Sequence, residues 1–402
     1  MTKRITILCL HPWTKWIGPH RYLFDIVSQL VGHDIDFIIA LHEKNDAAME
    51  FERLGCRIVI WPEVMQWRAS LAGDILLQNI SNITLGVRRL LPLVRQLSPS
   101  MILSNSEQIF IGSILAHRLG VPHVKIFHAM TFLYRLGGHP RLMQYFLSLL
   151  AAGSDKIIAV SETLRNALVK GGLNDDIVET VPNPMNISKI HHAAEAGLPK
   201  DIEEKLSGKY PIIVSAGVIF PKKGHDQLIE ALPGIKKKYS KCLALIAGDI
   251  GDDSGVEKTA DYFTSLKSRV FDLGLFENVI FTGAIDYLPA LMRRADVYVQ
   301  TSKTESFCRT VAEAILCGTP VVAYQTDAIP EVVGPGAVLV PPDDITGLVR
   351  SIIAAIEKRE QMRTMVLQGA AHIEERFESS LVARRFLEVI EKVLFERGEN
   401  RP

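Results

Sequence analysis

The sequence predicts an α/β protein with two doubly wound domains. Its 402 residues exceed what one hydrophobic core usually holds, so two domains are the first expectation. Short apolar runs alternate with helical patterns, as in parallel sheets that are covered by helices on both faces. This series occurs twice, and a polar segment separates the two occurrences. We therefore predict a first domain over residues 1–186, a linker over 187–208 and a second domain over 209–378.

The composition excludes several classes of protein. Lysine plus arginine and aspartate plus glutamate each total 45, a balance that argues against a general nucleic-acid binder. The five cysteines are scattered without zinc-finger spacing, so we expect buried, reduced thiols. We expect no signal peptide, because only a short apolar run follows the basic N-terminus. No run approaches the roughly 20 apolar residues that span a bilayer, so we predict a cytoplasmic protein.

Basic residues outnumber acidic ones between Phe51 and Tyr145. This region contains Trp61, Trp67 and a long helical pattern around Arg88. An ordinary domain helix with a solvated basic face is the simpler explanation. Docking of this helix to an anionic lipid or to a lipid-linked acceptor is the alternative. Peripheral contact with the inner face of a membrane is therefore a hypothesis.

The first domain opens with a buried strand over Ile5 to Leu10. A loop that ends at Gly18 follows, and then a helix with Pro19 in its first turn. The loop has no G-x-G-x-x-G, so a nicotinamide-binding opening is not predicted. The later elements of this domain are strands over 35–41, 57–61, 101–104, 121–127, 156–160 and 178–181 and helices over 47–54, 71–97, 107–119 and 162–170.

The second domain repeats the pattern of strands and helices. Its predicted elements are strands over 211–216, 242–247 and 279–283, helices over 225–232, 288–294 and 345–357, and a long amphipathic helix over 379–398. Between them, a strand begins at Val297 and a turn covers Ser302 to Glu305. A helix then begins near Ser306, which can cap it, and ends before Gly318. The loop after Val297 thus lies at the carboxyl end of a parallel strand, where such sheets bind ligands.

Two carboxylates in this unit suggest a binding site. Glu305 lies at the tip of the loop and Glu313 lies within the helix. The backbone N–H groups of the intervening residues would point out of the helix N-terminus, which predicts an anion site sized for phosphate. These residues are Phe307, Cys308, Arg309 and Thr310. The simpler alternative is a solvated loop glutamate and a surface helix glutamate.

The same stretch resembles the signature of retaining glycosyltransferases of the GT-B fold, in the large family four of group 1 type. The matching residues are Ser302, Glu305, Phe307, Glu313, Ala314, Gly318, Pro320, Val321 and Val322. Ser306 and Cys308 stand where the family usually has glycines. The resemblance implies two facing Rossmann-like domains, with the C-terminal helix crossing back onto the first.

A second motif extends the resemblance to the loop that begins at Gly217. Family members have an arginine and a lysine there, which clamp the donor diphosphate. Lys223 and Gly224 match this pattern, whereas Val218 occupies the arginine position. Lys222 or Arg309 are candidates for supplying the missing charge.

Further site residues are implied by the resemblance alone. His128 follows a predicted strand at the place where family members contact the donor sugar. Gly18 matches the glycine of the first loop, at which the backbone approaches the acceptor or the diphosphate. Ala284 and Ile285 lie where the family binds the donor base through backbone contacts.

The resemblance implies an enzyme that moves a sugar from a nucleotide-diphosphate sugar to a saccharide or lipid-linked acceptor, with retention of configuration. Lys223 would neutralise the leaving diphosphate, Glu305 and His128 would act on the sugar, and Glu313 would hold the ribose. The pathway would be polysaccharide, lipopolysaccharide or glycolipid synthesis. We expect no cofactor besides the co-substrate and no metal, because no Asp-x-Asp lies in a suitable loop. A sugar-nucleotide epimerase of the same fold and a non-catalytic sugar-binding descendant are the alternatives.

Overall fold

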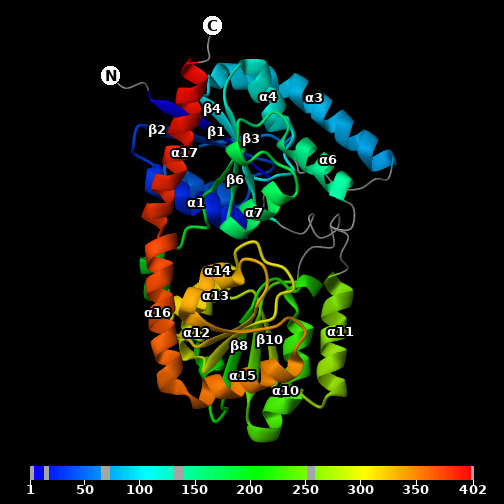
Figure 1. Cartoon of the computed structure of the whole chain (residues 1–402), viewed down its shortest axis with the longest axis vertical. Helices are drawn as coiled ribbons and strands as arrows, with labels where there is room; N and C mark the ends of the chain where they lie inside the picture. The colour runs from blue at the N-terminus through cyan, green and yellow to red at the C-terminus, as the bar shows by residue number, and fades with distance from the viewer. Residues whose placement is uncertain (1–3, 13–17, 65–72, 130–139, 251–258, 400–402) are drawn as a thin grey trace. The chain divides into compact units, whose positions relative to one another are not determined.

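The computed structural model describes residues 4–12, 18–64, 73–129, 140–250 and 259–399 (Figure 1). The chain divides into two compact units. Unit 1 holds Met1–Met185 and Ser379–Pro402, and unit 2 holds Asn186–Glu378. Each unit has its own parallel sheet with helices on both faces, which confirms the predicted fold class.

The sheet of unit 1 has the strand order β3-β2-β1-β4-β5-β6-β7 among the described residues, and all pairs are parallel. Its strands are β1 (Ile5–His11), β2 (Ile35–Leu41), β3 (Arg57–Ile60), β4 (Met101–Ser104), β5 (His123–Phe127), β6 (Lys156–Ala159) and β7 (Val178–Thr180). Alternate residues of β1 enter two different cores, with Ile7 and Cys9 in one and Leu8 and Leu10 in the other. This burial on both faces explains why the strands are continuous apolar runs.

Helices cover both faces of this sheet. They are α1 (Gly18–Leu30), α2 (Asp46–Arg53), α3 (Gly73–Leu97), α4 (Ile111–Leu119), α6 (Pro140–Ala151), α7 (Glu162–Lys170), the 3-10 turn η1 (Asp175–Ile177) and α17 (Ser379–Glu399). Residues of α3 and α4 form the core on one face, and residues of α1, α6, α7 and α17 contribute to the core on the other. None of the helices in the described part of the chain combines the length and the apolar character needed to cross a membrane.

Helix α17 returns the chain to unit 1. Its residues Val382, Phe386 and Ile390 recur every four positions and therefore share one face of the helix. All of them are fully buried in the core that contains Leu23 of α1. The two helices lie side by side, α17 in red and α1 in blue (Figure 1). The predicted return of the C-terminal helix is confirmed.

The sheet of unit 2 has the order β10-β9-β8-β11-β12-β13 among the described residues, again with parallel pairs. Its strands are β8 (Ile212–Ala216), β9 (Leu243–Ala247), β10 (Val279–Gly283), β11 (Val297–Gln300), β12 (Val321–Tyr324) and β13 (Ala337–Val340). Strands β8, β9 and β10 run outward to one edge, and β11, β12 and β13 run outward to the other. The direction in which the strands follow one another therefore reverses between β8 and β11.

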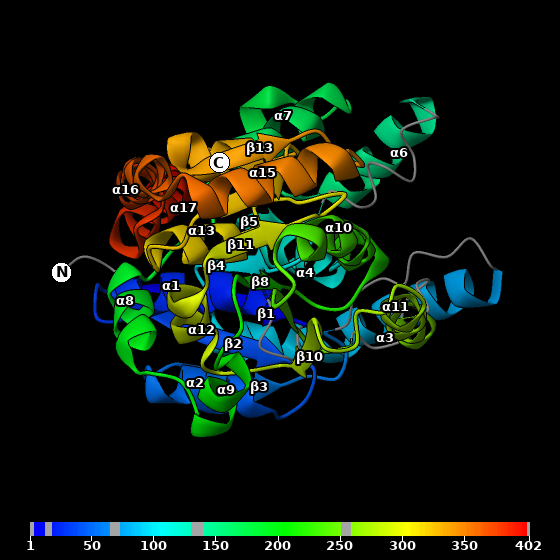
Figure 2. The same cartoon turned by 90° about the horizontal axis from the view of Figure 1, so that it is seen from below.

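Helices also cover both faces of the second sheet. They are α8 (Ile187–Glu195), α9 (Lys200–Leu206), η2 (Pro221–Lys223), α10 (His225–Lys238), α11 (Thr259–Asp272), α12 (Leu288–Arg294), α13 (Arg309–Leu316), α14 (Ile329–Val333), η3 (Gly334–Gly336), α15 (Ile345–Glu357) and α16 (Arg359–Phe377). Helices α10, α11 and α15 contribute to one core, in which α10 packs against α15 (Figure 2). Helix α13 packs against α8, α12 and α16.

The segment predicted as a linker, residues 187–208, folds as α8 and α9 and belongs to unit 2. Ile190 and Ala194 of α8 are buried, and α8 packs against α12 and α13. Ile202 and Leu206 of α9 are buried in the same way. In each pair the residues are four positions apart, which is enough for one narrow buried stripe on an otherwise polar helix.

Two predicted helix ends are wrong. Helix α10 continues through Pro233 to Lys238 rather than stopping at Leu232, because Leu232 and Ile235 are both buried in the core and hold the helix across the proline. Helix α4 begins at Ile111 rather than at Glu107.

Candidate functional site

The loops that follow β8 and β11 emerge together at the carboxyl ends of two neighbouring strands. The strand order reverses between these two strands, and open α/β sheets bind their ligands at such a switch point. The first loop contains Gly217 and Lys223, and the second contains Glu305. Thr301 Oγ1 donates a 2.7 Å hydrogen bond to the carbonyl oxygen of Gly224 and ties the two loops together. The topology of the sheet therefore brings the two sequence motifs into one site.

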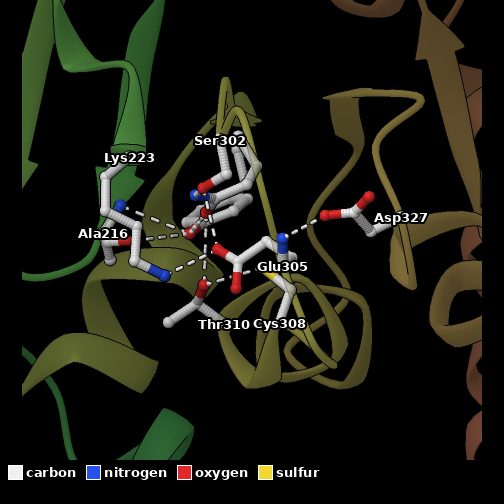
Figure 3. A network of polar contacts seen from close by, with 9 residues as sticks. Ala216, Lys223, Ser302, Glu305, Cys308, Thr310 and Asp327 are labelled. Atoms are coloured by element: carbon white, nitrogen blue, oxygen red, sulfur yellow. Dashed lines mark hydrogen bonds and ion pairs between the residues drawn. The ribbon is translucent and has the colours of Figure 1, made fainter. Parts of the chain in front are cut away.

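Lys223 and Glu305 form an ion pair at this point. The Lys223 ammonium lies 2.6 Å from Glu305 Oε1 (Figure 3). The exposed fraction of the side chain is 20% for Lys223 and 9% for Glu305, so the two charges are largely removed from water. Burial opposes the charge of Lys223, but the Glu305 carboxylate outweighs it and raises the pKa of Lys223 above its usual value. Lys223 is therefore charged at neutral pH, and the ion pair with Glu305 orients its ammonium group.

A network of hydrogen bonds also holds the carboxylate of Glu305 (Figure 3). Ser302 Oγ donates to Glu305 Oε1 at 2.8 Å, and Gln300 Nε2 donates to Ser302 Oγ at 2.7 Å. The Tyr298 hydroxyl donates to Gln300 Oε1 at 2.6 Å, and Thr310 Oγ1 donates to the same oxygen at 3.2 Å. Gln300 and Ser302 are completely buried. A buried network with this many partners restricts the rotamers of its members and preorganises the carboxylate.

The backbone of Glu305 is anchored as well. Its N–H donates to Asp327 Oδ2 at 2.8 Å, and its carbonyl oxygen accepts from the N–H of Ala328 at 3.3 Å. Asp327 belongs to the loop after β12, the next strand of the sheet. Tyr298, Gln300 and Asp327 were not predicted as site residues. Gln300 and Asp327 are marked in the sequence by lying at and after the carboxyl ends of predicted strands, whereas Tyr298, the second residue of β11, carries no such signal.

Helix α13 begins at Arg309, three residues later than predicted. Its N-cap position is Cys308, and Ser306 does not cap it. Cys308 adopts φ 73°, in the left-handed region that side chains with a Cβ seldom occupy. Ser306 is not among the residues with positive φ. Of the two positions at which the resemblance implies glycine, only position 308 therefore has a glycine-like backbone.

Replacing Cys308 by glycine should change the free energy of unfolding by less than about 1 kcal/mol. Glycine adopts the left-handed backbone without strain, which should stabilise the variant by about 1–2 kcal/mol. The variant also loses a buried side chain and gains freedom in the unfolded chain, which together should destabilise it by roughly 1.5 kcal/mol. The two effects nearly cancel. Cys317 is the matched control, because it is equally buried at the other end of α13 but has φ −74°. Cys317→Gly should therefore lose about 1.5 kcal/mol, as urea denaturation would measure. Equal losses for the two variants would contradict the assigned strain.

Glu313 is buried inside α13, with 5% of its surface exposed. It is therefore not a surface helix residue, which was the simpler expectation. Arg309 lies one turn earlier, with its Nε 3.8 Å from Glu313 Oε1. Arg309 was considered a substitute for the arginine that Val218 replaces, and the structure directs it toward Glu313. Phe307 is also buried and packs edge-on against Phe377 of α16, with 5.0 Å between the ring centroids.

Glycines allow the first loop to approach the second. Gly224 has φ 66°, and a Cβ at this position would lie 2.0 Å from the carbonyl oxygen of Thr301. No other residue fits there without moving backbone. Gly217 has φ 154° and packs against the stem of Lys223, whose Cδ would lie 3.4 Å from a Cβ at position 217. The structure thus accounts for both glycines of this motif.

Three implied site residues are not joined to this network. Ala284 and Ile285 follow β10, which is separated from β8 by β9. In the described chain no hydrogen bond connects either residue to Glu305 or Lys223. Gly18 begins α1 in unit 1, and a Cβ there would meet no described atom within 4 Å. Their roles at a base or at an acceptor stay predictions.

His128 lies in unit 1, directly after β5 and half-buried. Its Nε2 is 2.8 Å from Asn105 Oδ1, and its backbone N–H donates to Glu107 Oε2 at 3.2 Å. Burial lowers the pKa of His128 to about 3, so the ring is neutral at physiological pH. Glu107 was predicted to begin a helix, and the structure instead uses its carboxylate to hold the strand end at which His128 sits. Asn105 and Glu107, which the sequence did not single out, both contact His128.

No group of three or more His, Cys, Asp or Glu side chains in the described residues is arranged to hold a metal ion. The polar side chains of the site form hydrogen bonds and an ion pair with one another (Figure 3).

Two family models match this chain. The model described as "Glycosyl transferases group 1" matches residues 199–372, and the model described as "Glycosyltransferase Family 4" matches residues 17–189. The first match contains the Lys223–Glu305 pair, and the second contains His128. Each unit thus carries one of the two matches.

Characterised proteins share parts of the sequence. The phosphatidyl-myo-inositol mannosyltransferase of Mycobacterium leprae is 31% identical over 261 residues, which are 62% of this chain and 63% of that protein. The mannosylfructose-phosphate synthase of Agrobacterium fabrum is 26% identical over 171 residues, 42% of this chain and 37% of that protein. The chain thus matches less than two thirds of the length of either relative.

Solved structures share the fold over nearly the whole chain. Anabaena HepE in complex with UDP-glucose has a TM-score of 0.78 at 20% identity and covers 96% of this chain and 100% of its own. Sucrose-phosphate synthase from Thermosynechococcus elongatus has a TM-score of 0.73 at 16% identity, with coverages of 98% and 100%. At these identities the likeness is one of fold.

Proposed function

This chain belongs to the family 4 glycosyltransferases of the GT-B fold, and we propose that it transfers a sugar from a nucleotide-diphosphate sugar to an acceptor hydroxyl with retention of configuration. The observation that carries this proposal is the buried Lys223–Glu305 pair at the switch point of the second sheet. The binding of UDP-glucose by HepE, a protein of the same fold, supports a nucleotide-sugar donor. The proposed reaction needs no cofactor beyond this co-substrate.

The leaving diphosphate gains negative charge as the bond to the sugar breaks, so a catalyst must place positive charge beside it. Lys223 supplies a full charge, and the N-terminus of α13 supplies the partial positive charge of a helix start. Glu305 orients Lys223 and keeps it protonated. It also places a carboxylate beside the sugar, where positive charge develops.

Glu313→Gln should raise the donor KM by about tenfold and change kcat by less than about threefold. A buried carboxylate accepts hydrogen bonds from ribose hydroxyls in the ground state and the transition state alike, and loss of such uniform binding acts on KM. Steady-state kinetics with varied donor concentration measures both constants. A fall in kcat as large as the rise in KM would instead assign Glu313 to the chemical step.

The proposed activity is tested with a panel of nucleotide sugars that includes UDP-glucose and GDP-mannose. Incubation with glycolipid and saccharide acceptors should give a product whose anomeric configuration, read by NMR, is that of the donor. Exchange of the sugar's stereochemistry without transfer would identify an epimerase. Binding without turnover for every donor would identify a sugar-binding descendant, and an inverted product would refute retention.

We propose further that the acceptor is lipid-linked and that unit 1 docks on the cytoplasmic face of a membrane during polysaccharide or glycolipid synthesis. Helix α3 exposes Leu85 at 61% together with Arg88, and α6 exposes Tyr145 at 70% together with Arg141. Apolar side chains beside arginines suit an anionic lipid surface. Trp61, which was expected to take part, is buried in the core, and Trp67 lies outside the described residues.

Leu85→Glu combined with Tyr145→Glu should abolish co-sedimentation with vesicles of phosphatidylglycerol and phosphatidylcholine. Each substitution places a negative charge against an anionic surface and removes apolar contact. Phe271→Glu is the matched control, because Phe271 of unit 2 is exposed at 77% and is not part of the proposed surface. Equal sedimentation of the wild type with phosphatidylcholine alone, or at high salt, would count against docking.

A further inference from the structure

A row of four side chains lies along the carboxyl edge of the unit 1 sheet. His11 is the last residue of β1, Asn105 follows β4, His128 follows β5, and His20 lies in the first turn of α1. His128 Nε2 is 2.8 Å from Asn105 Oδ1, Asn105 Nδ2 is 2.8 Å from His11 Nδ1, and His11 Nε2 is 2.8 Å from His20 Nδ1. His11, His20 and Asn105 are completely buried. The row connects a half-buried histidine to the interior of the unit.

The orientation of the Asn105 amide is determined by a fourth contact. Asn105 Nδ2 lies 3.0 Å from the carbonyl oxygen of Pro19. A carbonyl oxygen only accepts hydrogen bonds, so the Asn105 atom that faces it must be the amide nitrogen. The reverse orientation would place two oxygens against each other. Oδ1 of Asn105 therefore faces His128, and the NH2 group faces both Pro19 and His11.

This orientation assigns the proton on each ring. Asn105 Oδ1 only accepts, so His128 must donate from Nε2 and carries its proton there. Asn105 Nδ2 only donates, so His11 Nδ1 must be unprotonated. Neutral His11 then carries its proton on Nε2 and donates it to His20 Nδ1. Each member of the row donates to the next, from His128 through Asn105 and His11 to His20.

The rings stay neutral in this environment. Burial lowers the pKa of His128 to about 3, and burial followed by the charge of Arg21 lowers the pKa of His20 to about 4. Burial, with His20 and His128 nearby, lowers the pKa of His11 well below its usual value. The charge of Arg21 acts on His20, and Glu107 Oε2 accepts the backbone N–H of His128. A single set of tautomers is therefore expected across the physiological pH range.

We infer that Asn105, His11 and His20 are positioning residues that hold His128 as its Nε2–H tautomer and leave its Nδ1 as an acceptor for a hydroxyl of the bound sugar. This rests on the proposed function and on the expectation, implied by the family resemblance, that His128 contacts the donor sugar. Among the described residues, no hydrogen bond reaches His128 Nδ1. A donor hydrogen bond at one ring nitrogen raises the basicity of the other, and hydrogen bonds in a chain strengthen one another. The row thus makes His128 a strong, neutral acceptor with a set orientation.

The aromatic ring of Tyr22 supports the same orientation of the His128 imidazole. Tyr22 packs against His128 with 5.2 Å between centroids at 81°, and its hydroxyl donates to the carbonyl oxygen of Val181. Tyr22 is completely buried. The imidazole is therefore held on its Nε2 side by Asn105 and by a T-shaped contact with the buried ring of Tyr22.

Nitrogen-15 NMR of the histidine rings tests the tautomers without any substrate. In wild-type protein, His11, His20 and His128 should each show a protonated Nε2 and an unprotonated Nδ1 between pH 6 and about 8, with signals assigned by His→Gln variants. Asn105→Asp replaces the NH2 group by a second acceptor. His11 Nδ1 should then become protonated while His128 Nε2 keeps its proton. A protonated Nδ1 on His11 or His128 in the wild type would overturn the inference, whether or not the protein is a transferase.

Ligand binding tests the function of the row. Asn105→Leu should weaken binding of UDP-glucose or GDP-mannose by about tenfold, as loss of one hydrogen bond to a sugar implies. The same variant should bind UDP or GDP within about twofold of wild type, because these lack the sugar. Equal weakening of the sugar nucleotide and the free nucleotide would show a purely structural role. If Asn105→Leu does not fold, His11→Gln provides the same comparison.

His123→Asn is the matched control for the loss of a buried histidine. His123 is completely buried and hydrogen-bonds Ser104 Oγ at 2.9 Å and Ser154 Oγ at 3.0 Å, but it lies at the amino end of β5. Its replacement should lower thermal stability, leave the His128 tautomer unchanged and leave the ratio of sugar-nucleotide to nucleotide affinity at the wild-type value. A changed ratio would mean that any damage to this sheet mimics the effect, and the assignment of the row would be wrong.

Discussion

Lys223→Met should reduce kcat by about a hundredfold, the loss expected when one preorganised electrostatic contact to a developing charge is removed. In the proposed mechanism the interaction of Lys223 with the diphosphate grows as the bond to the sugar breaks, so the effect should fall on kcat more than on KM. Val218 should make this dependence stronger, because the family resemblance implies an arginine at its position that would share the task. A single-turnover assay with saturating donor measures the chemical step directly. A kcat within about twofold of wild type would refute the diphosphate site.

The same substitution should lower the free energy of unfolding by about 3 kcal/mol, because it leaves the Glu305 carboxylate buried without its cation. Lys238→Met is the matched control. Lys238 also pairs with a glutamate of unit 2, Glu357, but both side chains are largely exposed. Exposed ion pairs contribute little to stability, so this variant should match the wild type in stability and in kcat. A comparable loss in both variants would mean that burial of the Lys223–Glu305 pair does not matter.

Glu305→Gln should reduce kcat by about thirtyfold, less than Lys223→Met, because the amide keeps the shape and one acceptor but loses the charge nearest the sugar. It should also introduce a new pH dependence. In the wild type the carboxylate raises the pKa of Lys223, so the stability contributed by the pair is lost only as pH rises through that raised pKa. Without the carboxylate, burial is the largest remaining influence and the pKa of Lys223 falls. Activity of Glu305→Gln should therefore decline with rising pH at values where the wild type is unaffected, and identical profiles would contradict this.

The double variant Lys223→Met with Glu305→Gln separates the two roles of the pair. It should be more stable than Lys223→Met, by about 2 kcal/mol of coupling between contacting groups, because no buried charge is left unpaired. Its kcat should be close to that of Lys223→Met, since residues that act as one unit are not additive. Additive losses of kcat would instead show that the two residues act at separate points of the reaction.

The sequence by itself determined the two parallel sheets. Strands such as Ile5–His11 and Leu243–Ala247 are buried on both faces, so their apolar runs are continuous. Such runs can be located in the sequence without knowing which strand pairs with them. It also predicted Glu305, Glu313 and Lys223 as site residues, because the glycines, the proline and the glutamates around them form a spaced pattern. Local rules were weaker at helix ends. Pro233 lies within α10 and the start of α13 is shifted to Arg309, because core packing overrides a local signal worth about 1–3 kcal/mol.

Only the tertiary structure decided which of these side chains touch. Lys223 and Glu305 are 82 residues apart and meet because β8 and β11 are neighbours at the switch point. Asn105 and His11 are 94 residues apart and meet because β4 pairs with β1 rather than with β3. The apolar pattern of a parallel strand is nearly the same whichever strand lies beside it. The pattern therefore predicts the position of a strand in the sequence but not the strand with which it pairs. Strand order is set by the packing of helices over the whole sheet. This order brings together the residues of the ion pair in unit 2 and of the histidine row in unit 1.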